Sequence, residues 1–240
     1  PDLIVHFKDS GDSIMHSAAR NGHLECLKWI HELNPDLIAH SNNERFSTMH
    51  FAALNGHLEC LKWIHETNAN LILNFKDSGS SIMHTATCYG HLKCLKWIHD
   101  TNPDLIVHFK NNGESIMHYA ARYGRLTCLK WIHETNADLI LHLTNYGESI
   151  LHSAASKGNL ECLKWIHETN PDLLENDGYS IMDTAAGKGN LKTLEWIHET
   201  KPDLVIHEND PLYAIQLVLR TNNGDCKKLS ISPANNFPAS

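Results

Sequence analysis

The chain lacks the features that mark several large classes of protein. It has 20 Lys and Arg against 28 Asp and Glu, a formal net charge of −8, and no basic run, which disfavours nucleic acid as a partner. No apolar run approaches the ~18 residues of a membrane span. The first residues contain neither an initiator Met nor a signal-peptide pattern. We therefore expect a soluble, cytoplasmic protein with no membrane partner.

Motifs that carry enzymatic chemistry are also missing. The sequence contains no Gly-x-Ser-x-Gly, phosphate-binding loop, His-Glu-x-x-His or Cys-x-x-Cys. Catalysis needs one asymmetric group of residues, whereas almost every His, Cys and Glu here is one of five or six equivalents. We predict no catalytic residue, no enzyme activity within this span, no cofactor and no small-molecule substrate.

Repetition is the feature that is present. The block at residues 13–36 recurs along the chain, and its Trp returns at intervals of 34 residues and a last interval of 31. These positions are Trp29, Trp63, Trp97, Trp131, Trp165 and Trp196. A unit this short cannot bury its own apolar face, so the copies must stack into an elongated solenoid.

Each copy reads as a pair of helices. Ser13 is a suitable N-cap for a helix over residues 14–20, and Gly22 supplies the positive φ that ends it. Apolar residues at intervals of three predict a second helix from about residue 24 to 33. We expect Asn34 to end that helix in the left-handed conformation.

Pro35 forbids continuation of the second helix. An extended segment at Leu37 and Ile38 is expected to follow it before the next loop.

The Trp residues of the second helices are large. If the side chain of Trp97 is fully buried, replacing it by Ala should cost ~3 to 5 kcal/mol of stability.

Together, the turn at Gly11, the Ser-Ile-Met-His segment, the Ala18–Ala19 pair, Gly-His-Leu-Glu and the Asn-Pro-Asp end resemble the ankyrin repeat. Ser-Ile stands where that family has Thr-Pro, and the sixth inter-repeat loop is three residues short. The resemblance implies an all-α ankyrin-repeat solenoid of stacked helix-turn-helix pairs joined by extended loops or hairpins. It also implies a protein-binding function.

Four segments follow from this reading. Residues 1–12 match residues 103–114 and would be the end of a truncated preceding repeat. Residues 13–206 would form the array of six repeats. Residues 207–232 would form a degenerate C-terminal cap, and residues 233–240 a mobile tail because they contain little apolar surface and two prolines.

Five cysteines occupy one position in successive repeats, namely Cys26, Cys60, Cys94, Cys128 and Cys162. Stacked helices lie ~8 to 10 Å apart, whereas a disulfide needs Cα atoms within ~7 Å. We therefore expect reduced, packed thiols.

The 19 histidines raise the question of a metal site. Cys26 and His31 lie ~140° apart on a helix and cannot share a metal, and the pair His23 and Cys26 offers only two ligands. We predict no metal site. Bridging between neighbouring residues of the His31 type is the remaining alternative to polar packing.

One histidine series follows Ser-Ile-Met or its variants: His16, His50, His84, His118 and His152. The ankyrin resemblance implies a structural hydrogen bond near the start of the first helix for these five. We expect them to be neutral and partly buried, with pKa values below the usual ~6.5.

Positions that vary while the rest of the repeat stays fixed are the candidates for partner binding, because packing does not dictate them. In ankyrin arrays the matching positions and the loop tips line the concave face, and aromatic and Arg side chains are the usual anchors of an interface. The candidates are Arg20, Phe46, Leu54, Asn55, Tyr89, Arg122, Tyr123, Tyr146, Lys157 and Tyr179. The alternative is that some of them merely fill space between repeats.

Two functions remain open. The first is a non-catalytic scaffold that binds a protein partner through the concave face and loop tips. The second is the targeting or substrate-recruiting arm of a larger enzyme, or of a secreted microbial effector that would act in a host cell's cytoplasm.

Overall fold

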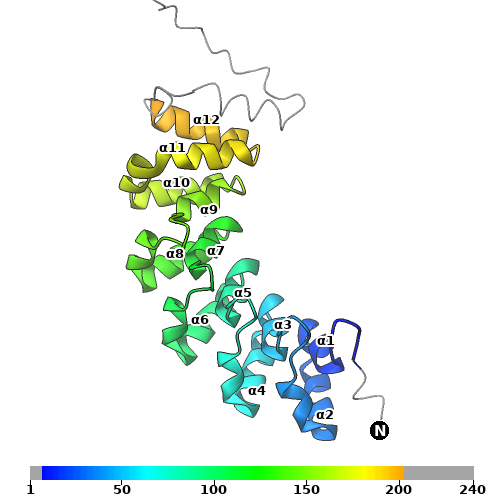
Figure 1. The fold of residues 1–240 in the computed structure, drawn as a ribbon. Helices are drawn as coiled ribbons and strands as arrows, with labels where there is room; N and C mark the ends of the chain where they lie inside the picture. The colour runs from blue at the N-terminus through cyan, green and yellow to red at the C-terminus, as the bar shows by residue number, and fades with distance from the viewer. Residues whose placement is uncertain (1–6, 203–240) are drawn as a thin grey trace, which may run out of the picture.

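A computed structural model describes residues 7–202, apart from the side chain of Tyr179. Each of the first five repeats contributes two antiparallel α-helices, and the helices stack into an arc (Figure 1). The first helices are α1 (Ile14–Arg20), α3 (Thr48–Leu54), α5 (Ile82–Tyr89), α7 (Ile116–Arg122) and α9 (Ile150–Ala155). The second helices are α2 (Leu24–Leu33), α4 (Leu58–Thr67), α6 (Leu92–Thr101), α8 (Leu126–Thr135) and α10 (Leu160–Thr169). The predicted all-α repeat fold is confirmed, and α1 and α2 have the predicted bounds.

Each helix packs against its equivalent in the next repeat. The first helices form one row, on the concave side of the arc in Figure 1, and the second helices form the other. We call the surface of the first row, with the loops that precede it, the concave face. These loops comprise residues 7–13, 40–47, 74–81, 108–115 and 142–149, and we number them first to fifth.

The start of each first helix is fixed by a reciprocal cap. Ser13 has an extended backbone and stands before α1, where its hydroxyl accepts from the His16 N–H and its own N–H donates to His16 Nδ1 at 2.9 Å. Two backbone donors that the helix leaves unpaired are thereby satisfied. The same box recurs at α3, α5, α7 and α9, which confirms the predicted Ser caps.

The ends of the second helices differ from the prediction. Asn34 has φ −149° and ψ 91°, so it is extended rather than left-handed. Residues after it form a 3₁₀ helix, not an extended segment. These short helices are η2 (Pro35–Ala39), η3 (Ala69–Leu73), η4 (Pro103–Val107) and η5 (Ala137–Leu141). Pro35 fits a first helical turn because its missing N–H needs no partner there. The tight turn directs both Leu37 and Ile38 into the core, where each is 4% exposed.

The core runs between the two rows. Met15, Met49, Met83 and Met117 are fully buried, as are Leu61, Leu95 and Leu129 from the second row. Trp29 is 57% exposed, and the other five members of the Trp series lie at the edge of this core and are only partly buried. Trp97 therefore contributes less to stability than a fully buried Trp would.

The cysteine series is mostly packed. The cysteines of residues 7–202 are free, and the later members of the series are at most 2% exposed, namely Cys60, Cys94, Cys128 and Cys162. Burial raises the pKa of Cys94 and of Cys162 to about 11, which agrees with the predicted packing role. The prediction was wrong for Cys26, which is exposed. Among the described residues, no further helix packs against that side of α2.

The sixth repeat departs from the others. Helix α11 (Asp172–Gly187) runs without a break through the place where a loop and a first helix would stand, and α12 (Leu191–Thr200) follows it. The three missing residues leave no room for a hairpin loop. Ser180 thus lies inside a helix rather than at its start, and its hydroxyl pairs with His152 Nε2 at 2.9 Å.

Several predictions lie outside the described residues: the fold of residues 1–6, the last residues of the array at 203–206, the cap at 207–232 and the tail at 233–240. No helix within residues 7–202 has the length and apolar character to cross a membrane.

Candidate protein-binding face

Stacked rings link consecutive loops on the array. Phe7 of the first loop contacts His40 at 4.3 Å between ring centres with the rings tilted by 32°, and Phe109 stacks on His142 at 4.0 Å. Phe75 stacks on His108 at 4.2 Å. In each case the histidine Nε2 lies 2.8 to 2.9 Å from a glycine carbonyl of the preceding loop. These contacts join the loops into a layer by linking the first loop to the second, the third to the fourth and the fourth to the fifth.

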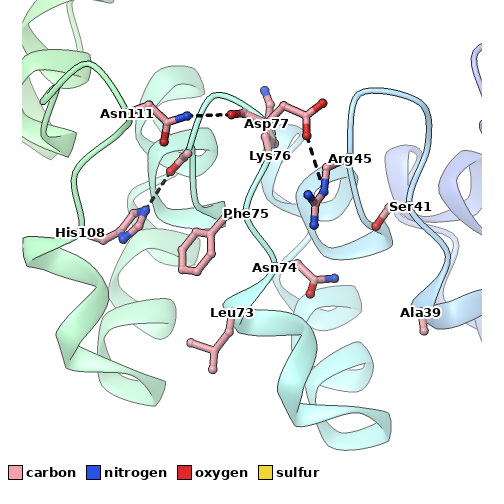
Figure 2. Close-up of a pocket in the computed structure, with 11 residues that line it drawn as sticks. Ala39, Ser41, Arg45, Leu73, Asn74, Phe75, Lys76, Asp77, His108 and Asn111 are labelled. Atoms are coloured by element: carbon pink, nitrogen blue, oxygen red, sulfur yellow. Dashed lines mark hydrogen bonds and ion pairs between the residues drawn. The ribbon is translucent and has the colours of Figure 1, made fainter.

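One step of this layer is interrupted. Ser41 and Asn74 occupy the Phe and His positions between the second and third loops. Beside them lies an open, largely polar pocket of about 530 Å³ (Figure 2). Arg45 borders it and reaches Asp77 at 3.7 Å, and the amide of Asn111 donates to the Asp77 carbonyl at 2.8 Å.

Arg45 also has an unusual backbone. Its φ is 61°, and it is the one non-glycine residue in residues 7–202 with a positive φ. Gly11, Gly79, Gly113 and Gly147 hold the equivalent position in the other loops, with φ of 77° to 81°. A side chain there costs free energy because the left-handed region crowds Cβ. The second loop thus departs from the repeat at several neighbouring positions.

Buried carboxylates organise two parts of the concave face. Asp12 is 7% exposed and pairs with Arg20 at 3.2 Å. Glu114 is 2% exposed and pairs with Lys110 at 3.0 Å and with Arg122. Burial alone would raise the pKa of the Glu114 carboxyl, but Asn112, Lys110 and Arg122 outweigh it and lower that pKa.

Five of the predicted partner-binding residues are exposed, and one of them, Asn55, bonds to another repeat. Tyr89 is 47% exposed and Tyr123 41%, at equivalent positions one repeat apart. Tyr146 is 78% exposed at the tip of the fifth loop. Lys157 is exposed after α9.

Two predicted residues are engaged within the array. Arg20 lies over the Phe51 ring at 4.3 Å in addition to its ion pair. Arg122 turns toward buried Glu114, and its side chain is 25% exposed. Arg122 therefore holds the fourth loop to its helix, which matches the space-filling alternative better than the role of a free anchor.

The remaining predicted residues are partly buried, paired or not described. Phe46 packs on Phe51 at 5.4 Å between ring centres, and Leu54 is partly buried. The exposed amide of Asn55 donates to the Arg20 carbonyl at 2.8 Å, so it also links two repeats. The side chain of Tyr179 lies outside the described part of the structure.

Three residues that the sequence analysis did not single out complete the middle of this face. Lys76 lies over the Phe46 ring at 3.7 Å, and Lys110 lies over Tyr119 at 5.1 Å. Tyr119 contacts Tyr123 at 5.6 Å between ring centres. The sequence did carry a signal for the ion pairs of this face, because an acid before the cap coincides with an Arg eight residues later in the first and fourth repeats only.

The histidines of the concave row have a defined chemistry. His16 Nδ1 accepts from the Ser13 N–H, so the ring proton resides on Nε2, which lies 3.2 Å from the His40 carbonyl. Protonating Nδ1 would break the cap. Burial lowers the pKa of His16 and His118 to about 4 and that of His50 and His84 to about 3. It also lowers the pKa of His152. The predicted direction is confirmed.

The histidines of the second helices face rings rather than one another. His31 meets the edge of Trp63 at 5.7 Å, and His99 meets Trp131 at 5.6 Å. Across residues 7–202, no three His, Cys, Asp or Glu side chains are placed to share a metal ion. These contacts favour packing over the bridging alternative.

A solenoid of helix pairs, with loops layered along one edge and variable side chains on one face, defines a repeat scaffold. Profiles of ankyrin repeats match residues 49–142, and a second ankyrin repeat profile matches residues 15–65 and 151–198. The chain belongs to the ankyrin repeat family. Ankyrin repeats are generally protein–protein interaction modules and are typically non-catalytic. No protein of curated function matches the sequence.

Proposed function

We propose that this chain is a non-catalytic scaffold that binds a partner protein through the concave face and loop tips of repeats two to five. The observation that carries the proposal is the exposure of Tyr89 and Tyr123 at matching positions in adjacent repeats. Tyrosine offers a large contact area at a small cost in side-chain entropy, and interfaces are enriched in it. On the same two helices, residues of the fixed pattern such as Met83 and Met117 are fully buried.

The test replaces Tyr89 and Tyr123 together by Ala and compares partner capture from a lysate of the source cells by quantitative mass spectrometry. We expect the double variant to lose the proteins that the wild-type chain captures specifically, while its circular dichroism and melting midpoint stay nearly unchanged. The matched control replaces two exposed leucines of other surfaces, Leu33 and Leu141, by Ala.

Arg122 is left out of this variant because its ion pair with Glu114 makes it structural. Equal capture by the tyrosine variant and the wild type would reject this face. A separate hypothesis is that the chain acts in the cytoplasm as the targeting arm of a larger enzyme or effector. Complete flanking sequence would test it.

A further inference from the structure

The third and fourth loops share one backbone but differ in charge. The Lys76 N–H donates to the Ser80 carbonyl at 3.0 Å, and the Lys110 N–H donates to the Glu114 carbonyl at 3.0 Å. Ser80 is 3% exposed and Glu114 is 2% exposed, so the position is buried in both loops. Glu114 compensates Lys110 there, whereas Ser80 provides no charge for Lys76.

The Lys76 ammonium is therefore left without the ion pair that Lys110 has. It lies 3.7 Å from the centre of the Phe46 ring, and among the described residues it forms neither a hydrogen bond nor an ion pair. Burial lowers its pKa, with Glu44 acting against that shift and Lys110 adding to it. A partly desolvated ammonium gains from the ring beneath it but retains unsatisfied N–H donors.

Apolar and aromatic groups surround this cation. Phe46 lies under it, the partly buried Cys88 lies on the next first helix, and Tyr123 lies beside the Cys88 thiol. Tyr119 and Tyr123 continue the surface across the fourth repeat. The middle of the concave face therefore presents, in Lys76, a cation that has no ion pair among the described residues and lies beside aromatic rings, on a chain whose net charge is −8.

We propose that Lys76 receives an Asp or Glu side chain of the partner protein, and that apolar groups next to this acid contact Phe46 and Tyr123. The inference rests on the proposed function and names the partner's chemistry. A carboxylate at this place would complete the arrangement that Glu114 builds inside the fourth repeat, where the acid accepts from the lysine of the loop. The partner segment is thus acidic and carries aromatic or aliphatic neighbours.

The experiment uses the full chain and a fluorescent random copolymer of Glu and Tyr as the probe, with binding followed by anisotropy. We expect the copolymer to bind the wild type and the affinity to fall with added salt. Lys76→Gln should weaken binding about tenfold. Lys8→Gln is the matched control, since Lys8 holds the same position in the first loop and is exposed; its affinity should match the wild type.

A second variant places a carboxylate of the chain itself beside Lys76. Ser80→Glu should place a carboxylate next to Lys76, as Glu114 lies next to Lys110, and weaken copolymer binding about tenfold without lowering the urea midpoint. If the copolymer does not bind, or if Lys76→Gln binds it as the wild type does, the proposal is wrong. Tighter, Lys76-dependent binding of a single-stranded oligonucleotide would also overturn it.

Failure of this inference can be told apart from failure of the proposed function. Lost partner capture in the tyrosine double variant, with capture unchanged in Lys76→Gln, would leave the scaffold function standing and remove the acidic contact. Unchanged capture in the tyrosine variant would instead reject the face itself.

Discussion

The two rows of helices carry histidines at equally regular intervals, yet these residues have different surroundings. In the concave row, His84 Nδ1 is paired with Ser81 and His84 Nε2 lies 3.3 Å from the Glu114 carbonyl of the next repeat. In the outer row, His99 meets the edge of Trp131, and its buried Nδ1 has no hydrogen-bond partner among the described residues.

Position within the repeat therefore decides what a repeated side chain does. A helix start offers unpaired N–H groups, which the concave histidines satisfy. The outer histidines contact Trp rings of the next repeat, and these Trp side chains are only partly buried. The concave row should consequently carry most of the stability and most of its pH dependence.

The largest expected effect is loss of stability in acid. Because the folded pKa values of the concave histidines lie at about 3 to 4, below the unfolded value of ~6.5, the unfolded chain binds more protons as the pH falls. Stability should be full above about pH 6.5 and decline toward the folded pKa values. At pH 5 each of the four histidines His16, His50, His84 and His118 removes ~2 kcal/mol of stability.

Urea titrations at pH 7.5, 6.5, 5.5 and 5.0, at constant ionic strength, measure this effect. The midpoint should fall at each step below pH 6.5. A midpoint that holds steady or rises on acidification would show that the concave histidines are not held neutral by the fold.

A smaller effect compares core and edge within α6. Ile98 is fully buried, whereas Trp97 is partly buried on the same helix. Ile98→Ala should cost ~2 to 5 kcal/mol through lost contacts and the cavity left behind. Trp97→Ala should cost less than Ile98→Ala despite removing more atoms, and denaturant midpoints at pH 7.5 measure both. The reverse order would place the Trp series in the core.

The smallest effect concerns the loop tips. Gly113 and Gly147 have φ of 81° and 77°. A Cβ on Gly113 would lie 2.7 Å from the Asn145 backbone nitrogen, whereas one on Gly147 meets no atom of the described chain within 4 Å. Gly147→Ala should cost ~1 kcal/mol for the left-handed backbone alone, and Gly113→Ala should cost more because the loops must separate. Equal melting midpoints would show that the loops do not stack closely.

Local signals in the sequence were sufficient for the repeat and its two helices. Ser13 and Gly22 bound α1 as predicted, because a cap and a positive φ depend on residues only a few positions apart. The three-residue spacing of apolar residues likewise indicated the second helix. Asn34 and the 3₁₀ helix after it were predicted wrongly, since the burial of Leu37 and Ile38 against the neighbouring repeat favours the tighter turn.

The sequence by itself determined the repeat, its two helices and the caps, because these depend on contacts that recur within one copy or between identical copies. Only the tertiary structure decided which variable residues are free. Arg122 and Tyr123 are adjacent in sequence, yet one pairs with buried Glu114 and the other is exposed. The packing of the third loop against the second also placed Lys76 over Phe46. The Lys76–Phe46 contact joins residues about 30 positions apart that differ from copy to copy, so neither the period nor the local pattern contains it.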